Sequence, residues 1–389
     1  RACALCGFYF LIQWFYEYKS KYNVIEIKDF YTVQEDTIIS ISGRIIFIRD
    51  LGKLVFIKIS DINGIVQLSI DSILDDYKLI KDNIDIGDFI TAEGSIYFTT
   101  AGEKTIKVIK LIPRRKAILP LPDKWHGLQD KDTIIRKRYL ELISSEECRN
   151  KFKIRHKVIS LIRQFFNTLE YIEVETPILQ NIASGAAANP FKTHHNALHM
   201  DLFLRIAPEL FLKRLIIGGY NKVFEIGKCF RNEGIDTTHL QEFTMLEMYE
   251  TYINFEDLKS LGISLLLFII NAVKPGSITK IPQYSYKEFL LEFGGINIDI
   301  LENYNDLVVE SKKYNINIED YPTYNILLDQ LYKKACVSKV INPVLVYDYF
   351  ASPLAIKKDI AHNIGYQFQI IMNGCEIIKS YLEQNDPII

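Results

Sequence analysis

The stretch Phe230–Glu250, FRNEGIDTTHLQEFTMLEMYE, is the part of this sequence that is most informative about the fold. The residues just before it, KVFEIGKCF (Lys222–Phe230), alternate in the manner of a β-strand, and EFTMLEMYE (Glu242–Glu250) does so again. The loop between the two runs begins with Arg231 and contains a glycine, a histidine and two acids. The pattern predicts two strands joined by a polar loop.

Alternation also predicts which side chains share a face of these two strands. One face of the first strand carries Val223, Glu225, Gly227, Cys229 and Arg231, and the other carries Phe224, Ile226 and Phe230. On the second strand Phe243, Met245, Glu247 and Tyr249 are aligned. Buried charges must be paired, so this face suits a site for a charged ligand better than a core. A structural Arg–Glu pair on an open sheet is the alternative.

Composition sets broad limits on the class of protein. With 389 residues, 48% hydrophobic and 24% charged, the chain is long enough for two domains and is typical of soluble globular proteins. A net charge of -2 excludes a uniformly basic nucleic-acid coat but permits a local basic groove. The apolar run Phe8–Tyr16 is shorter than the ~20 residues that span a bilayer.

Six cysteines are scattered along the chain, and only Cys3 and Cys6 have CxxC spacing. A zinc site needs further ligands nearby, and none follow. We therefore expect free thiols in a reducing cytoplasm, with no association with a membrane.

The chain changes character near residue 113. From Thr37 to Ile112 short strand patterns with Asn-Gly and Ala-Gly turns surround one polar helical piece. Three strands, a helix and two strands suit a five-stranded OB-fold β-barrel, although any small β-barrel gives a similar pattern. Pro113–Asp132 is rich in proline and charge and is typical of a linker. The remainder mixes helices and strands, which indicates an α+β domain.

Several motifs together resemble one family. They are FRNEG with the later His and Glu-Phe, RIAPEL (Arg205–Leu210), ETPIL (Glu175–Leu179) and the junction at 121–142. The chain resembles the class II lysyl-tRNA synthetases from about Thr37 to Pro387. The related aspartate and asparagine enzymes share the barrel but differ at these motifs, and the short lysine ligases lack the barrel. The resemblance implies an N-terminal extension (1–34), an anticodon-binding barrel (35–112), a linker (113–132) and a catalytic domain with an antiparallel sheet flanked by helices (133–389).

The resemblance implies an ATP-dependent ligase that makes lysyl-adenylate and transfers lysine to its tRNA. Arg231, the expected catalytic residue, would bind the α-phosphate and the lysine carboxylate. The other residues expected at ATP are Glu233, His239, Glu242 and Phe243, which would stack on adenine. Gly185 and Glu209 would bind the α-ammonium of lysine, and Glu247, Tyr249 and Glu383 its ε-ammonium. Glu376 would bind Mg²⁺, the expected cofactor.

The barrel would read the tRNA anticodon. Phe56 would stack on a base, while Arg49, Gln67 and Glu103 would hydrogen-bond base edges. The alternative for Phe56 is ordinary barrel core. The helical pattern at 147–169 resembles the family's dimer-forming motif and predicts a homodimer, the alternative being an ordinary amphipathic helix.

The chain also departs from the family pattern. Gln369 stands where the family has a metal-binding Glu, and Lys379 stands where it has an Asn, with Glu383 within possible reach. HLQEF replaces the usual Asn-Pro before Glu-Phe, and Ser184 replaces a Gly. The family's last motif, a Gly-rich segment with an Arg, would fall after Ile389, so we expect a fragment with little ATP–pyrophosphate exchange by itself. A degenerate paralogue that binds tRNA or a protein without aminoacylation, or a simple nucleic-acid-binding barrel, are the alternatives.

Overall fold

The computed structural model describes residues 22–75, 77–119, 121, 130–186, 188–234, 239–301, 303–350 and 354–385. Some of the sequence features named above lie outside the described residues: the apolar run Phe8–Tyr16, the pair Cys3 and Cys6, and residues 120 and 122–129 of the predicted linker. The chain divides into two compact units, one up to Lys153 and one from Ile154 onward.

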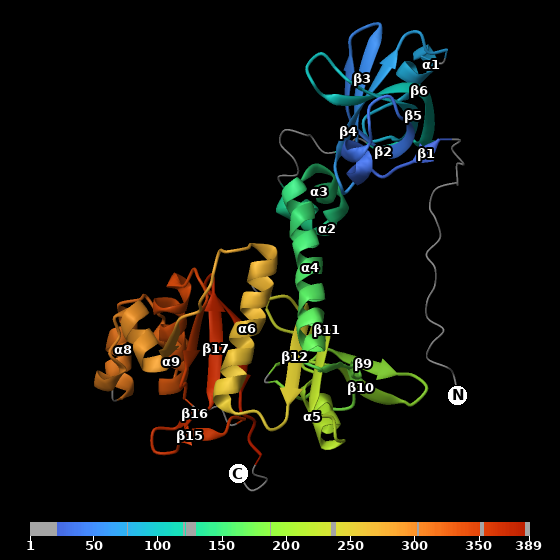
Figure 1. Ribbon diagram of the computed structural model, residues 1–389. Coiled ribbons are helices and arrows are strands. Elements are labelled where there is room, and N and C mark those ends of the chain that lie inside the picture. Colours follow the sequence, from blue (N-terminus) through green and yellow to red (C-terminus); the bar gives the residue numbers. More distant parts are fainter. Residues whose placement is uncertain are drawn as a thin grey trace. The chain divides into compact units, whose positions relative to one another are not determined.

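The first unit is built around a closed β-barrel (Figure 1). Its main elements are β2 (Ile38–Asp50), β3 (Leu54–Ser60), β4 (Ile65–Asp71), α1 (Tyr77–Asn83), β5 (Phe89–Phe98) and β6 (Lys104–Arg115). The strand order β2-β3-β4-β6-β5 is closed by pairing of β5 with β2. Three strands, a helix and two strands thus form the predicted OB-fold barrel, and that prediction is confirmed.

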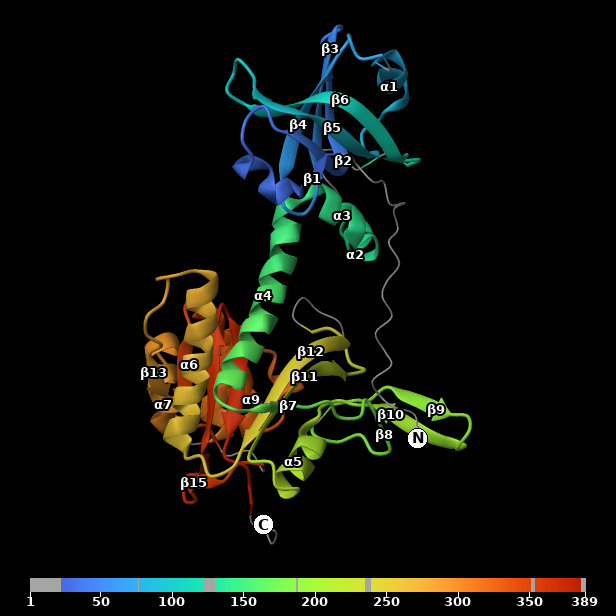
Figure 2. The same ribbon diagram turned by 45° about the vertical axis from the view of Figure 1, so that its right-hand side comes forward.

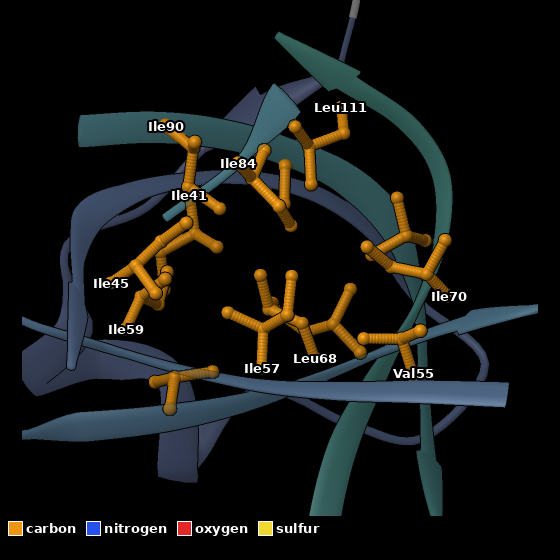
Figure 3. Packing of buried hydrophobic residues seen from close by; sticks show 14 of the residues in the cluster. Ile41, Ile45, Val55, Ile57, Ile59, Leu68, Ile70, Ile84, Ile90 and Leu111 are labelled. Carbon is orange, nitrogen blue, oxygen red and sulfur yellow. The ribbon is translucent and has the colours of Figure 1, made fainter. Parts of the chain in front are cut away.

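The barrel core follows from strict alternation along its strands. In β3, Val55, Ile57 and Ile59 are buried, whereas Phe56 and Lys58 between them point outward. The inward branched side chains of all the strands meet in one aliphatic core, shown in Figure 3. Phe56 is therefore a residue of the outer face, and the ordinary-core alternative for it is wrong.

The barrel unit begins before residue 35. Strand β1 (Asn23–Val24) pairs in parallel with β2, and the short helix η1 (Ile27–Thr32) follows it. Ile27 and Phe30 are buried in the same core as the barrel strands. The described residues after β6 add two short helices to this unit, α2 (Lys131–Arg136) and α3 (Arg138–Ser144).

In the described residues of the second unit, the strands form four small sheets, and helices cover them (Figures 1 and 2). Its elements are the later part of α4 (Glu146–Thr168), β7 (Ile172–Glu173), β8 (Leu179–Gln180), β9 (Lys192–His195), β10 (Met200–Leu204), α5 (Glu209–Ile217), β11 (Lys222–Phe230), β12 (Glu242–Glu250), α6 (Phe255–Val273), β13 (Gln283–Ser285), α7 (Tyr286–Phe289), α8 (Tyr304–Lys312), α9 (Tyr324–Ala335), β14 (Val344–Tyr347), β15 (Lys357–Asp359), β16 (Ile364–Gly365), β17 (Gln367–Met372) and β18 (Cys375–Tyr381). Helices α8 and α9 lie in the stretch between β13 and β14.

Strands β11 and β12 pair antiparallel over the full length of both predicted strands. The face with Phe224 and Ile226 packs against α4 and α6, and the ring of Phe224 stacks on Phe166 at 4.9 Å between centroids. The other face carries the predicted polar residues, so the assignment of faces from alternation is confirmed. A second sheet, ordered β13-β14-β17-β18, is covered by α6 through Leu258, Leu266 and neighbouring apolar residues.

No helix among the described residues is long and apolar enough to cross a membrane. The cysteines of the described residues, Cys148, Cys229, Cys336 and Cys375, are all free thiols.

Candidate active site

The polar face of β11 is organised by a buried ion pair. The guanidinium of Arg205, just after β10, lies 2.5 Å from the carboxylate of Glu225, and both side chains are at least 96% buried. Thr176 of the ETPIL motif donates its hydroxyl to Glu225 at 2.7 Å, and its own oxygens accept from Arg205. Because each charge is paired and hydrogen-bonded, the pair forms a rigid base for the neighbouring groups. The partner of Glu225 is thus Arg205 and not Arg231.

Gly227 is in the middle of β11 because this guanidinium crosses the strand there. A Cβ at position 227 would lie 2.0 Å from Nη2 of Arg205 and 2.9 Å from Oε1 of Glu225.

Gly227→Ala must therefore displace a buried ion pair. We expect a loss of about 3–5 kcal/mol in the free energy of unfolding, measured by urea denaturation. Gly219→Ala is a comparison variant, because Gly219 has a positive φ but open space around it. It carries only the backbone strain and should lower the free energy of unfolding much less. Equal effects of the two substitutions would contradict this role of Gly227.

Glu247 lies directly opposite Glu225 in the β11–β12 register. Burial raises the pKa of the Glu247 carboxyl to about 8, and the carboxylates of Glu209 and Glu225 act in the same direction. The guanidiniums of Arg205 and Arg231 oppose this shift in pKa. Oε2 of Glu247 is buried and has no hydrogen-bond partner among the described residues. Such an atom is costly unless a ligand supplies a donor.

Arg231 follows β11 and lies at the same end of the hairpin as Phe243. Its guanidinium carbon is 5.1 Å from the centroid of the Phe243 ring, which is within cation–π range. Its Nε is also buried without a partner in the part of the chain that the structure describes. Glu242 does not join this group, because it begins β12 on the opposite face and pairs with Lys228 at 2.9 Å.

Two further acids meet at the start of α5. The ammonium of Lys213 donates to Oε1 of Glu209 at 2.7 Å and to Oε2 of Glu383 at 2.8 Å. Gly185, with φ +90°, is packed so closely behind that a Cβ there would lie 3.1 Å from Cβ of Glu209. The structure thus brings Gly185, Glu209 and Glu383 together, and the lysine that reaches Glu383 is Lys213 rather than Lys379.

The phenol of Tyr249 lies among the carboxyls of Glu209, Glu247 and Glu383. Burial raises the pKa of its phenol, and Glu247, Glu209 and Glu383 all interact with it electrostatically. Tyr381, near the end of β18, has a pKa raised by burial and by the same three carboxyls. Glu209, Glu247 and Glu383 therefore converge around two phenols, with Arg231 close to Glu247.

The loop between β11 and β12 carries two other predicted residues. Glu233 accepts a long hydrogen bond of 3.4 Å from the backbone of Asn189, and the backbone of Asn232 donates to the carbonyl of Asn189 at 2.7 Å. His239 is exposed just before β12, and residues 235–238 lie outside the described part.

Gln369 and Glu376 form a separate group on β17 and β18. The amide oxygen of Gln369 accepts from the hydroxyls of Tyr349 at 3.0 Å and Tyr332 at 3.3 Å. Glu376 interacts electrostatically with Lys379. No group of three or more His, Cys, Asp or Glu side chains in the described residues is arranged to hold a metal ion.

The outer face of the barrel brings the other predicted residues together. Arg49 lies opposite Phe56 across β2 and β3, and Gln67 lies opposite Lys58 across β3 and β4. Lys58 donates to Glu103 at 2.8 Å, which ties the end of the β5–β6 loop to this face. An aromatic ring among basic and amide side chains on one strand surface is a typical single-stranded nucleic-acid surface.

Sequence reasoning missed Arg205, Lys213, Tyr381 and Lys58. Arg205 is the first residue of the RIAPEL motif, and Lys213 follows that motif by three positions. The spacing of four between Glu209 and Lys213, which places both on one face of a helix, is the signal that could have indicated Lys213. Tyr381 precedes Glu383 by two positions, which in a strand indicates the same face.

The comparisons with known proteins match both units. A model described as "tRNA synthetases class II (D, K and N)" matches residues 130–389, and one described as "OB-fold nucleic acid binding domain" matches residues 39–113. Together with the barrel and the β11–β12 site, these matches define a class II aminoacyl-tRNA synthetase with an anticodon-type barrel.

The curated relatives narrow this class. The chain is 39% identical to a lysine--tRNA ligase of Helicobacter hepaticus over 96% of this chain and 76% of that protein. It is 40% identical to a lysine--tRNA ligase of Aliarcobacter butzleri over 90% of this chain and 72% of that protein, and 37% identical to the one of Clostridium tetani over 94% and 76%. The chain therefore belongs to the lysine--tRNA ligase family.

Proposed function

We propose that this chain activates L-lysine with ATP to lysyl-adenylate and passes the lysyl group to the 3′ end of its tRNA. The observation that carries the proposal is the convergence of three carboxyls, with an unpartnered Oε2 on Glu247 and an unpartnered Nε on Arg231 nearby. Lysine has two ammonium groups, which can pair with carboxyls of the site, and one carboxylate, which can pair with Arg231. Hydrogen bonds to charged groups contribute roughly 1.5–3 kcal/mol each.

Each group has a role that its chemistry suits. The planar guanidinium of Arg231 would bind the substrate carboxylate and the α-phosphate, since its fixed fork of donors matches both anions. Phe243, beneath that guanidinium, would offer its ring to adenine. Glu209 would take the α-ammonium, while Glu247, Glu383 and Tyr249 would take the ε-ammonium.

The reaction needs no base from the protein, because the lysine carboxylate is itself the nucleophile. One of its oxygens attacks the α-phosphorus of ATP, a new O–P bond forms, and the bond to pyrophosphate breaks. Arg231 would neutralise charge on the phosphate and hold the two reactants in line. The terminal ribose hydroxyl of the tRNA then attacks the lysyl carbonyl, and AMP leaves.

Lysine-dependent exchange of pyrophosphate into ATP tests this proposal. For a protein that includes the family's last motif, exchange with lysine and with no other natural amino acid is the expected result. A protein that carries this motif and binds tRNA but gives no exchange would favour the degenerate paralogue, the alternative to which the departures at Gln369 and Lys379 point.

We infer that Mg²⁺ takes part as a complex with ATP. Mg²⁺ usually keeps several waters and binds through one or two carboxylates together with substrate phosphates, so a dedicated cage of side chains is unnecessary. Glu376 is the carboxylate that the family resemblance assigns to it. Pyrophosphate exchange should require Mg²⁺. In Glu376→Gln the Mg²⁺ concentration needed for half-maximal exchange should be higher than in the unaltered protein.

For the barrel we propose anticodon binding by Arg49, Phe56, Gln67 and Glu103. Phe56→Ala should weaken binding of tRNA(Lys) by about 1–3 kcal/mol, the contribution of one stacked base. Filter binding measures this change, and lysine-dependent pyrophosphate exchange should stay unchanged because the anticodon is not needed for it. Leu54→Ala, on the same outward face of the same strand, is the matched control. A parallel loss of exchange and of tRNA binding would contradict the role of Phe56.

We further propose a cytoplasmic homodimer, with α4 at the subunit interface. The support is the resemblance of this helix to the family's dimer-forming motif, together with exposed apolar residues such as Phe152 and Ile154 on it. Sedimentation at micromolar concentration should give twice the mass of the chain. The domain limits expected from sequence are residues 35, 113 and 133, whereas Ile27 and Phe30 already belong to the barrel core and the first compact unit ends at Lys153.

A further inference from the structure

Lys213 is the feature of the site to which the proposed function gives no role. It lies one helical turn after Glu209 on α5, so the two side chains share a face of the helix. Its ammonium bridges Glu209 and Glu383 at 2.7 and 2.8 Å, and only 29% of its side chain is exposed. It therefore joins an acid of α5 to an acid just after β18.

The bridge fixes the spacing of two groups that would otherwise repel each other. Two carboxylates in a poorly solvated site disfavour each other's ionised form. A shared ammonium removes that repulsion and limits the separation of the two bonded oxygens to the length of two hydrogen bonds. Each carboxylate accepts at about four positions, so the bridge leaves room on both for a second donor.

The charges of the site favour a ligand with two cationic groups. Glu225 is neutralised by Arg205, which leaves the carboxyls of Glu209, Glu247 and Glu383. When Glu247 ionises on binding, Lys213 neutralises one of three negative charges, and the other two match two ammonium groups. Arg231 remains for one carboxylate.

We propose that Lys213 determines the length specificity of the site, because its bridge sets the distance between the carboxylates that receive the two ammonium groups of the amino acid. This inference rests on the proposed function and adds a positioning residue to it. An amino acid shorter by one methylene would reach one carboxylate and leave the other unsatisfied. Lys213 itself makes no contact with the reacting carboxylate.

Calorimetric binding of L-lysine and L-ornithine to the full chain tests the proposal. The unaltered protein should prefer lysine by about 10–100-fold, the usual discrimination for one methylene. Lys213→Met, which keeps the length of the side chain and removes the charge, should reduce the preference to below about threefold. Lys213→Arg can still donate to both carboxylates and should restore most of it.

A matched control separates this role from a loss of charge or of stability. Lys313→Met breaks a Lys–Glu pair of 2.7 Å at the end of α8 and should leave the preference unchanged. If Lys213→Met changes the affinities for lysine and ornithine by the same factor, the bridge does not set length and the inference is overturned. If the unaltered protein binds neither amino acid, the proposed function itself fails.

Discussion

Arg231→Ala should lower the rate of adenylate formation by about 10²–10⁴-fold, because two charge-assisted hydrogen bonds of roughly 1.5–3 kcal/mol each are lost. The substrate carboxylate and the α-phosphate would both lose their main donor. Lysine-dependent pyrophosphate exchange in the full-length protein measures the rate, and calorimetry measures the loss of lysine affinity. Arg231→Lys should recover only part of either, since an ammonium lacks the planar fork.

Arg214→Ala is the matched control for this prediction. Arg214 is an arginine of α5 whose guanidinium lies 4.9 Å from the ring centroid of Phe211, so it makes the same kind of cation–π contact on the same unit. It belongs to none of the proposed binding groups, and its removal should change exchange less than twofold. An Arg231→Ala protein with normal exchange would refute the assignment of an anion-binding role to Arg231.

Lysine binding should weaken steeply as the pH falls below 8. The pKa of Glu247 in the free protein is raised to about 8, mainly by burial, so at neutral pH the carboxyl is mostly protonated. A ligand ammonium binds the ionised form, and binding therefore releases a proton. The affinity follows the ionised fraction and should be roughly 50-fold lower at pH 6 than at pH 8. Titration calorimetry in buffers of different ionisation enthalpy measures both the affinity and the proton released.

Glu247→Gln removes the titrating group and should abolish the proton release. It should also raise the lysine requirement far more than the ATP requirement, since Glu247 is not among the residues proposed to bind the nucleotide. Glu256→Gln, an exposed acid in the first turn of α6, is the control and should leave the pH profile unchanged. A lysine affinity that varies less than twofold between pH 6 and pH 8 would show that Glu247 does not face the ligand.

The strands and their faces could be predicted from sequence because alternation is a local property. The limits of β11 and β12 coincide with the two predicted runs, and Glu225, Glu247 and Tyr249 lie on the predicted face. The branched residues of β3 placed Phe56 outside the barrel for the same reason, and the structure confirms it.

The partners of these side chains could not be predicted, because they come from other elements. Glu225 shares a face with Arg231, yet it pairs with Arg205, which follows a different strand. Lys213 looks in sequence like an ordinary solvated helix residue, and its contact with Glu383 spans 170 positions. The inclusion of Ile27 and Phe30 in the barrel core was missed because residues 1–34 showed no strand pattern that continued into the barrel.

Equilibrium binding of L-lysine and L-norleucine to the protein tests most directly whether the converging carboxyls recognise a second ammonium group. The two amino acids have side chains of nearly the same length, and only lysine carries the ε-ammonium. Lysine should bind and norleucine should be weaker by at least about 100-fold, the effect of leaving buried charged groups unpaired. Equal affinities for the two would contradict the account.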